Sequence, residues 1–305
     1  MMHRLAILSD LAEQYRAVIE KENLPDLTIE STPGPDTDIL LGNPHLMKNI
    51  LASLPALSWV QSTSAGVELL MDSSLRRDYV LTNARDVFGR LMSEYIFGYL
   101  LAHERQIFQR FADQQAKRWN DENTGVLYGK TIGLLGVGSI GAEVAKTAKF
   151  FNMTVRGYTQ KSEMSADVDH YFHGNDLLKF ANGLDYLVSI LPNTKETRKI
   201  VNADVLNALP THALFISVGR GSAVDESALL NALTQNKIAG AVLDVFEKEP
   251  LPQDHPFWTT PNLLMTFHTS APSLPEDIAK LFIENYKLFN QGKPLKFQVD
   301  FEKGY

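Results

Sequence analysis

The sequence contains no cysteine, no hydrophobic run long enough to cross a bilayer and no excess of basic residues. Without cysteine there can be no disulfide bond, thiolate metal site or cysteine nucleophile. A membrane-spanning helix needs about 20 consecutive apolar residues, and no run approaches that length. The 29 lysines and arginines stand against 36 acidic residues, and the net charge of −7 argues against general nucleic-acid binding. We therefore expect no membrane, nucleic-acid or metal partner.

The composition is ordinary for a globular protein that acts on a small molecule. The chain has 305 residues, which suggests about two domains, and is 44% hydrophobic and 21% charged. Near the N-terminus a brief apolar run is followed at once by Asp10 and Glu13, with no small-residue cleavage site. This pattern is typical of a strand and a helix rather than a signal peptide. We expect a cytoplasmic protein.

A glycine motif lies near the middle of the chain, in Gly129–Gly141 (GKTIGLLGVGSIG). The apolar run Ile132–Leu135 predicts a buried strand, and the helix formers AEVAKTAKFF follow the glycines. Gly136 permits a tight turn, Gly138 lets the backbone approach a pyrophosphate, and Gly141 lets the helix pack closely on the strand. A strand, a glycine turn and a helix in this order favour a dinucleotide site. The alternative is a glycine turn with a structural role only.

Short apolar segments alternate with helical ones along the whole chain, which predicts two doubly wound α/β domains with parallel sheets. The predicted strands are His3–Leu8, Leu27–Glu30, Asp38–Leu41, Leu57–Val60, Thr131–Leu135, Thr154–Tyr158, Tyr186–Ile190, Ala213–Val218, Ala239–Leu243 and Leu263–Phe267. The predicted helices are Asp10–Lys21, His45–Leu51, Leu91–Gln109, Ala142–Phe151, Asp225–Leu233 and Pro275–Asn290. We interpret Leu91–Gln109 as a bridge between domains and a candidate subunit interface, and Asp113–Thr124 as an exposed loop.

Polar motifs follow several of the predicted strands, at the edge where open α/β sheets bind ligands. Gln61–Val67 (QSTSAGV) follows one strand, and its small residues leave the backbone accessible to a ligand. Read as an isolated segment, it is equally a surface turn.

Three side chains at later strand ends have the chemistry of carbonyl reduction. Arg220, between two glycines, could bind both oxygens of a carboxylate through two of its guanidinium nitrogens. Glu249 and His268 could form a carboxylate–imidazole pair for proton transfer beside a nicotinamide. Each has a plain alternative, because Arg220 could pair at a sheet edge, Glu249 could be a solvated loop acid and His268 could be structural. The other seven histidines stand in settings that we do not consider comparable.

The chain resembles the D-isomer-specific 2-hydroxyacid dehydrogenases over nearly its whole length. The segments that carry the resemblance are Gly129–Gly141, Leu191–Asn202, Ser217–Leu233, Ala239–Pro252 and the strand that ends in His268. The resemblance implies a Rossmann nucleotide-binding domain, 98–272, inserted into a flavodoxin-like substrate domain, 1–97 with 273–305. It also implies a homodimer that pairs around the nucleotide domains.

The resemblance further implies roles for individual residues. Arg220, Glu249 and His268 match the family's catalytic positions, and Ser64, Ala65 and Gly66 match the loop whose N–H groups hold the substrate carboxylate together with Arg220. The cofactor positions are Gly136, Gly138, Ser139, Ile140, Gly141, Thr159, Gln160, Lys161, Leu191, Pro192, Thr197, Val218, Gly219, Arg220, Asp244 and His268. The chain departs from the family pattern at Phe267, where proline is usual, and over Thr269–Pro272, and these changes leave substrate size and polarity open.

The reaction implied is reduction of a small 2-oxo acid, glyoxylate or hydroxypyruvate among them, to the D-2-hydroxy acid. Arg220 and the N–H groups of Ala65 and Gly66 hold the carboxylate, and His268 protonates the carbonyl oxygen while Glu249 orients the imidazole. The alternatives are a cofactor-sensing regulator on the same fold without significant turnover, and an enzyme for another carbonyl compound.

The end of the second nucleotide-domain strand predicts NADP(H) rather than NAD(H). An NAD-preferring site usually places an acid there for the ribose 2′-OH, whereas Tyr158 is followed by Thr159, Gln160, Lys161 and Ser162. The nearest acid is Glu163, farther into the loop. Thr159 and Ser162 could donate to a 2′-phosphate, and Lys161 would add positive charge. Alternatively, Lys161 is a solvated residue and Thr159 bonds the NAD ribose.

Overall fold

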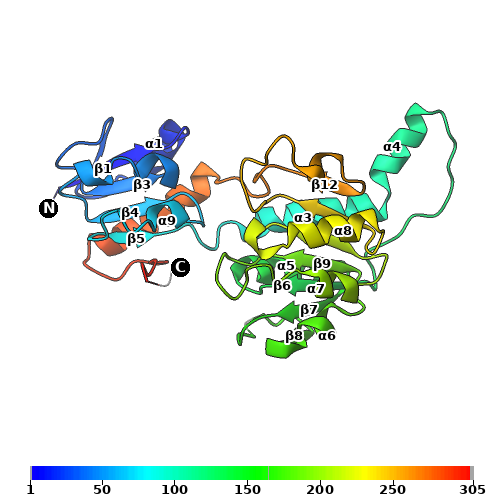
Figure 1. Cartoon of the computed structure of the whole chain (residues 1–305). Coiled ribbons are helices and arrows are strands. Elements are labelled where there is room, and N and C mark those ends of the chain that lie inside the picture. The colour runs from blue at the N-terminus through cyan, green and yellow to red at the C-terminus, as the bar shows by residue number, and fades with distance from the viewer. Residues whose placement is uncertain (1, 164, 303–305) are drawn as a thin grey trace. The chain divides into compact units, whose positions relative to one another are not determined.

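The computed structural model describes residues 2–163 and 165–302 and divides the chain into two units (Figure 1). One unit combines residues 1–87 with 273–305, and the other comprises 88–272. The domain boundary implied by the resemblance, after residue 97, falls inside helix α3 (Gly89–Glu104), which belongs wholly to the second unit. The last three residues of the implied substrate domain, 303–305, lie outside the described part.

The first unit contains a five-stranded sheet in the order β2-β1-β3-β4-β5, with every neighbouring pair parallel. This is the flavodoxin-like order. Its strands are β1 (His3–Leu8), β2 (Leu27–Glu30), β3 (Ile39–Gly42), β4 (Trp59–Ser62) and β5 (Val80–Thr82). The helices are α1 (Ala12–Lys21), α2 (Pro44–Met47), α9 (Pro275–Phe289) and the 3₁₀ turns η1 (Leu51–Ser53) and η2 (Glu68–Leu70). Trp59 is fully buried and stacks on Phe282 of α9.

The second unit contains a seven-stranded sheet in the order β12-β11-β10-β9-β6-β7-β8, again with parallel neighbours. The strands are β6 (Thr131–Leu135), β7 (Thr154–Tyr158), β8 (His170–Phe172), β9 (Tyr186–Ser189), β10 (Leu214–Ser217), β11 (Gly240–Leu243) and β12 (Leu263–Met265). The order reverses between β6 and β9, which is the topological switch point of a Rossmann sheet. The predicted doubly wound, parallel fold is therefore confirmed.

Helices accompany this second sheet (Figure 1). They are α3 (Gly89–Glu104), α4 (Ile107–Gln115), α5 (Ser139–Phe150), α6 (Leu177–Ala181), α7 (Ala203–Ala208) and α8 (Glu226–Thr234), with the 3₁₀ turns η3 (Gly174–Asp176), η4 (Gly221–Ala223) and η5 (Pro256–Thr259). All four residues of β9, β10 and β11 are buried, as expected for parallel strands covered on both faces. Among the described residues, we find no helix that is long and apolar enough to cross a membrane.

The region after α3 differs from the sequence-based prediction. The helix predicted over 91–109 is two helices, because Gln106 adopts a left-handed backbone (φ 49°) and ends the first. The predicted exposed loop 113–124 begins inside α4, and Asp113 is buried. Its carboxylate accepts hydrogen bonds from Gln109, Arg118 and Asn120. These bonds from residues within seven positions of Asp113 hold the end of α4 and the start of the following loop together.

Candidate active site

The candidate cofactor residues lie where β6 ends and α5 begins. Gly136 has a positive φ of 96°, which a residue with a side chain rarely adopts. A Cβ on Gly141 would approach the carbonyl oxygen of Gly136 to 2.4 Å, so the close contact of turn and helix requires glycine. At Gly138, which precedes the first helical residue, a Cβ would meet only open space. The backbone at the start of α5 is thus open to a ligand, and its first N–H groups have no partner within the helix. This arrangement fits a pyrophosphate.

A second close approach joins the ends of two neighbouring strands, β9 and β10. A Cβ on Gly219 would lie 2.5 Å from both the backbone nitrogen and the carbonyl oxygen of Leu191. The Val218 N–H also donates to the carbonyl oxygen of Ser189. These contacts hold the loops that carry Pro192 and Arg220 side by side at the carboxyl edge of the sheet.

The loop after β7 has a different arrangement from the one that its sequence suggests. The Thr159 hydroxyl donates to the carbonyl oxygen of Ser162 (2.7 Å) and lies 3.2 Å from His173 Nδ1. Glu163 Oε1 is 2.9 Å from His173 Nε2, which draws this acid toward β8. Lys161 is exposed. Of the polar groups proposed for a 2′-phosphate, Thr159 therefore already has partners within the loop, whereas Lys161 points to solvent.

Glu249 and His268 form a hydrogen-bonded pair, with Oε2 2.7 Å from Nδ1. The other carboxylate oxygen, Oε1, accepts from the Phe246 N–H at 3.0 Å, so the carboxylate is fixed at both ends. The hydrogen bond to Glu249 raises the pKa of His268 above its ordinary value, although burial works against it. For Glu249, burial alone would raise the pKa, but the bonds from His268 and Phe246 lower it overall. The pair therefore favours imidazolium beside carboxylate and leaves Nε2 for proton transfer.

Arg220 lies close enough to this pair for its charge to lower the pKa of both partners. Its Nη1 donates to the carbonyl oxygen of Gly219 at 2.9 Å. The structure thus brings a guanidinium, a carboxylate and an imidazole together at the edge of the sheet that also bears the glycine turn. Such a group can hold an anionic substrate and move a proton.

Carboxylate pairing alone does not distinguish His268 from the other histidines. His3, His173, His212 and His255 also face carboxylates, those of Asp38, Glu163, Asp185 and Glu226. What sets His268 apart is its place after β12, at the carboxyl edge, together with the nearby cation of Arg220.

In the first unit, the loop after β4 is held by side chains beneath it. Ser62 Oγ accepts from the Ser64 N–H and donates to the Ser64 carbonyl oxygen, both at 3.0 Å. Asn83 donates from Nδ2 to the Ala65 carbonyl oxygen at 2.9 Å. These bonds fix the backbone of residues 62–65, so its direction is set before any ligand arrives.

Comparison with known proteins gives the evolutionary context of this arrangement. Residues 97–270 match the family model described as D-isomer specific 2-hydroxyacid dehydrogenase, NAD binding domain. The chain belongs to the D-isomer specific 2-hydroxyacid dehydrogenase family. Its sequence is 32% identical to glyoxylate/hydroxypyruvate reductase A of Klebsiella pneumoniae over 261 residues, which are 82% of each chain.

Solved structures agree with this membership. A D-isomer specific 2-hydroxyacid dehydrogenase family protein of Aeromonas salmonicida has a TM-score of 0.95 at 40% identity, covering 99% of this chain and 100% of its own. A D-isomer specific 2-hydroxyacid dehydrogenase of Xanthobacter autotrophicus, in complex with NADPH and MES, has a TM-score of 0.88 at 31% identity, with both chains fully covered.

This dehydrogenase is therefore an NAD(P)-dependent oxidoreductase of 2-hydroxy and 2-oxo acids, and the predicted family, fold and reaction class are confirmed. The roles assigned to single residues remain predictions. Sequence reasoning did not single out Asn83, or the hydroxyl groups of Tyr95 and Thr266 that contact the histidine loop. Asn83 follows β5, which was not predicted, and a hydroxyl's direction cannot be inferred from its position in the sequence.

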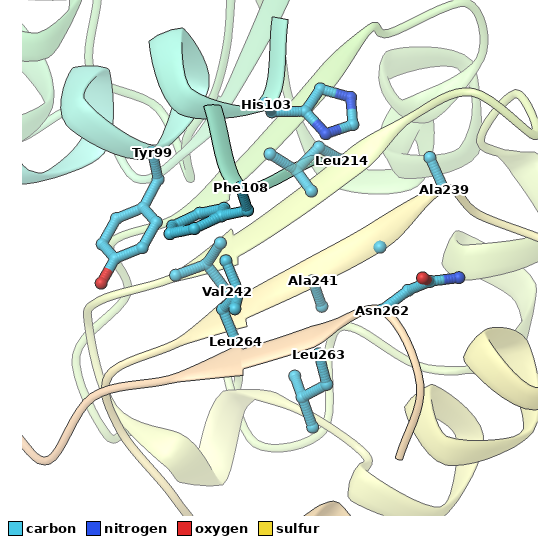
Figure 2. Close-up of a pocket in the computed structure, with 11 residues that line it drawn as sticks. Tyr99, His103, Phe108, Leu214, Ala239, Ala241, Val242, Asn262, Leu263 and Leu264 are labelled. Atoms are coloured by element: carbon cyan, nitrogen blue, oxygen red, sulfur yellow. The ribbon is translucent and has the colours of Figure 1, made fainter. Parts of the chain in front are cut away.

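A separate hollow of about 360 Å³ lies away from these residues (Figure 2). It is bordered mainly by residues at the amino ends of three strands, such as Leu214, Gly240 and Leu263, and by Tyr99, His103 and Phe108. The catalytic candidates follow the carboxyl ends of the same strands, β10, β11 and β12. The hollow is therefore distinct from the candidate active site.

Proposed function

We propose that this dehydrogenase reduces a small 2-oxo acid to its D-2-hydroxy acid, with NADPH as the preferred reductant. The observation that supports it best is the Glu249–His268 pair, beside the charge of Arg220, on the sheet edge that carries the Gly136–Gly141 turn. The substrate class follows from the family. The preference for small acids such as glyoxylate or hydroxypyruvate follows from the Klebsiella relative that is named for them.

In the proposed mechanism, His268 acts as the general acid. The bound nicotinamide supplies a hydride for the carbonyl carbon of the substrate. Negative charge then develops on the carbonyl oxygen, and His268 donates its Nε2 proton to that oxygen. Glu249 holds Nδ1 and keeps the imidazole charged before transfer. General acid catalysis of this kind typically contributes about 10²–10⁴-fold in rate.

Arg220 binds the substrate carboxylate in this proposal, and the N–H groups of Ala65 and Gly66 complete the clamp. A guanidinium can bond both carboxylate oxygens at once, which fixes the plane of the acid as well as its position. The hydrogen bond from Asn83 to the Ala65 carbonyl oxygen supports the second part. It orients the following peptide, so the Gly66 N–H does not have to be ordered by the substrate.

The preference for NADPH rests on the loop after β7. Residues 159–162 contain no acid, and Glu163 is held by His173, so the charge that would repel a 2′-phosphate is partly neutralised. Exposed Lys161 can approach such a phosphate. The Xanthobacter relative was solved with NADPH. Because Thr159 donates within its own loop, we assign the phosphate contact to Lys161 and Ser162.

We also propose that the protein is a cytoplasmic homodimer. Helix α4 projects from the rest of its unit (Figure 1) and exposes Ile107, Phe108 and Phe111. Phe108 borders the hollow beside β11 and β12, where Leu264 is also exposed. A second copy would cover these apolar side chains. Light scattering of the purified protein measures this directly, and a monomer at micromolar concentration contradicts it.

The decisive test of function is oxidation of NADPH in the presence of glyoxylate, followed by nicotinamide absorbance. We expect substrate-dependent oxidation, faster than with NADH. Hydroxypyruvate and larger 2-oxo acids, tested with both cofactors, identify the preferred side chain. If NADPH binds but none of the acids or a panel of other carbonyl compounds oxidises it, the protein is a cofactor-sensing regulator and the proposed function is wrong.

A further inference from the structure

Asp244 lies at the end of β11 and is fully buried beneath the loop that carries His268. The loop runs over this carboxylate and is bonded to it repeatedly. Oδ1 accepts from the Thr266 hydroxyl at 2.5 Å and from the Thr269 N–H at 2.9 Å. Oδ2 accepts from the Ser270 N–H at 3.0 Å.

These three bonds tie the loop to one carboxylate, which can only accept hydrogen bonds when it is ionised. Burial alone would raise the pKa of Asp244, but the bonds from Ser270, Thr266 and the Thr269 N–H lower it overall, so the group is charged at neutral pH. The resemblance implied that Asp244 is a cofactor ligand. In this structure the carboxylate is fully buried, and its partners are residues on either side of His268.

Tyr95, on α3, extends this arrangement outward. Its hydroxyl oxygen is 2.6 Å from Thr266 Oγ1. Thr266 has a single proton, which it gives to Asp244, because an ionised carboxylate can only accept. Tyr95 must therefore donate to Thr266. Burial raises the pKa of Tyr95, so the phenol retains the proton it donates.

His268 itself has a left-handed backbone, with φ of 57°. That conformation is unfavourable for a residue with a side chain and persists only where its surroundings enforce it. Its N–H donates to the Asp244 carbonyl oxygen at 2.8 Å, while the two residues that follow it are bonded to the Asp244 carboxylate. The same residue thus fixes both the backbone of His268 and the loop beyond it.

We propose that Tyr95, Thr266 and Asp244 form a hydrogen-bonded brace that positions His268 for proton transfer. The proposal rests on the proposed function in assigning proton transfer to His268. The brace holds the left-handed backbone at His268, and this backbone directs Nδ1 of the ring toward Glu249. The charged groups that face His268 are Glu249, Arg220 and Asp244, and the bond to Glu249 has the largest effect on the imidazole. If the backbone at His268 loosens, this bond weakens.

The test compares Thr266→Val, which keeps the shape but removes the hydroxyl, with Thr266→Ser, which keeps the hydroxyl. Thr234→Val is the matched control, because that hydroxyl bonds only to α8 carbonyl oxygens. Tyr95→Phe is a milder second variant, since Asp244 keeps all its donors. We expect Thr266→Val to lower kcat about 10- to 100-fold, in line with the cost of small misplacements, with an unchanged Kd for NADPH. Thr266→Ser should restore most of the rate.

An NMR titration of the His268 imidazole supplies a readout that does not depend on turnover. In Thr266→Val the pKa of His268 should fall toward the ordinary value, whereas in Thr234→Val it should stay as in the parent protein. An unchanged His268 titration in Thr266→Val would overturn the brace, whatever the Kd for NADPH. If His268→Ala retains full turnover, the proposed function fails, but the titration still decides whether the brace positions His268.

Discussion

Glu249 Oε2 lies 2.7 Å from His268 Nδ1, and the opposite oxygen of the same carboxylate accepts from the Phe246 N–H. The acid is therefore anchored to its own loop and cannot follow the imidazole if that ring moves. The carboxylate therefore sets the orientation of the imidazole ring. It also sets the proton affinity of the ring, because the bond raises the pKa of His268.

Glu249→Gln should shift the pH dependence of reduction. His268 must be protonated to act as an acid, so kcat falls as pH rises through its pKa, and in the parent protein this fall comes above the ordinary histidine value of about 6.5. Replacing the carboxylate removes the main cause of the raised pKa, so the fall should move to lower pH. Rate profiles of both proteins check this, and superimposed profiles would contradict it.

The same pair predicts how stability depends on pH. His268 has a raised pKa in the folded state, so its contribution is present at low pH and is lost as pH rises through the folded value. Glu249 has a lowered pKa, so its contribution is lost as pH falls through its folded value. A double-mutant cycle with Glu249→Gln and His268→Gln should therefore show coupling near pH 5.5 but none near pH 9. For so exposed a pair the coupling is at most about 1 kcal/mol, and equal coupling at both pH values would argue against a charged pair.

Two glycine substitutions separate cofactor binding from folding. Gly138→Ala places its Cβ in open space, where the proposed pyrophosphate approaches. We expect NADPH binding to weaken at least about 10-fold with Tm unchanged. Gly141→Ala would push a Cβ against the Gly136 carbonyl oxygen at 2.4 Å, so it should lower Tm as well. Calorimetric titration measures the Kd for NADPH and thermal melts measure Tm. Full NADPH affinity in Gly138→Ala would show that the pyrophosphate does not bind at this turn.

Lys161→Ala tests the choice of cofactor. Removing a cation from beside a 2′-phosphate should raise the KM for NADPH about 10-fold and leave that for NADH nearly unchanged. Lys237→Ala is a suitable control, because this exposed lysine bonds to Asn207 in a different part of the unit. A parent protein that prefers NADH, or equal effects of Lys161→Ala on both cofactors, would refute the assignment.

The sequence was sufficient for the fold and for naming candidate site residues that the structure brings together. The apolar run Thr131–Leu135 has the predicted bounds, because a buried parallel strand needs a continuous apolar segment. Strand-end motifs then led to Arg220, Glu249 and His268, since the ends of parallel strands share one edge.

Other features depend on side-chain directions and backbone conformations that no periodic pattern encodes. The left-handed residue Gln106 and the buried network of Asp113 split and extended a helix that periodicity treated as one. Short elements such as β5 and α7 have too few residues for a periodic signal. The inward bond of the Thr159 hydroxyl and the bonds of Thr266 likewise depend on side-chain directions.

The most direct test of this account compares the parent protein with His268→Ala in two assays, NADPH oxidation by glyoxylate and NADPH binding. If His268 is the proton donor in reduction of a 2-oxo acid, kcat should fall about 10²–10⁴-fold while the Kd for NADPH stays within experimental error. A His268→Ala protein that reduces glyoxylate as fast as its parent would show that the proton comes from another group.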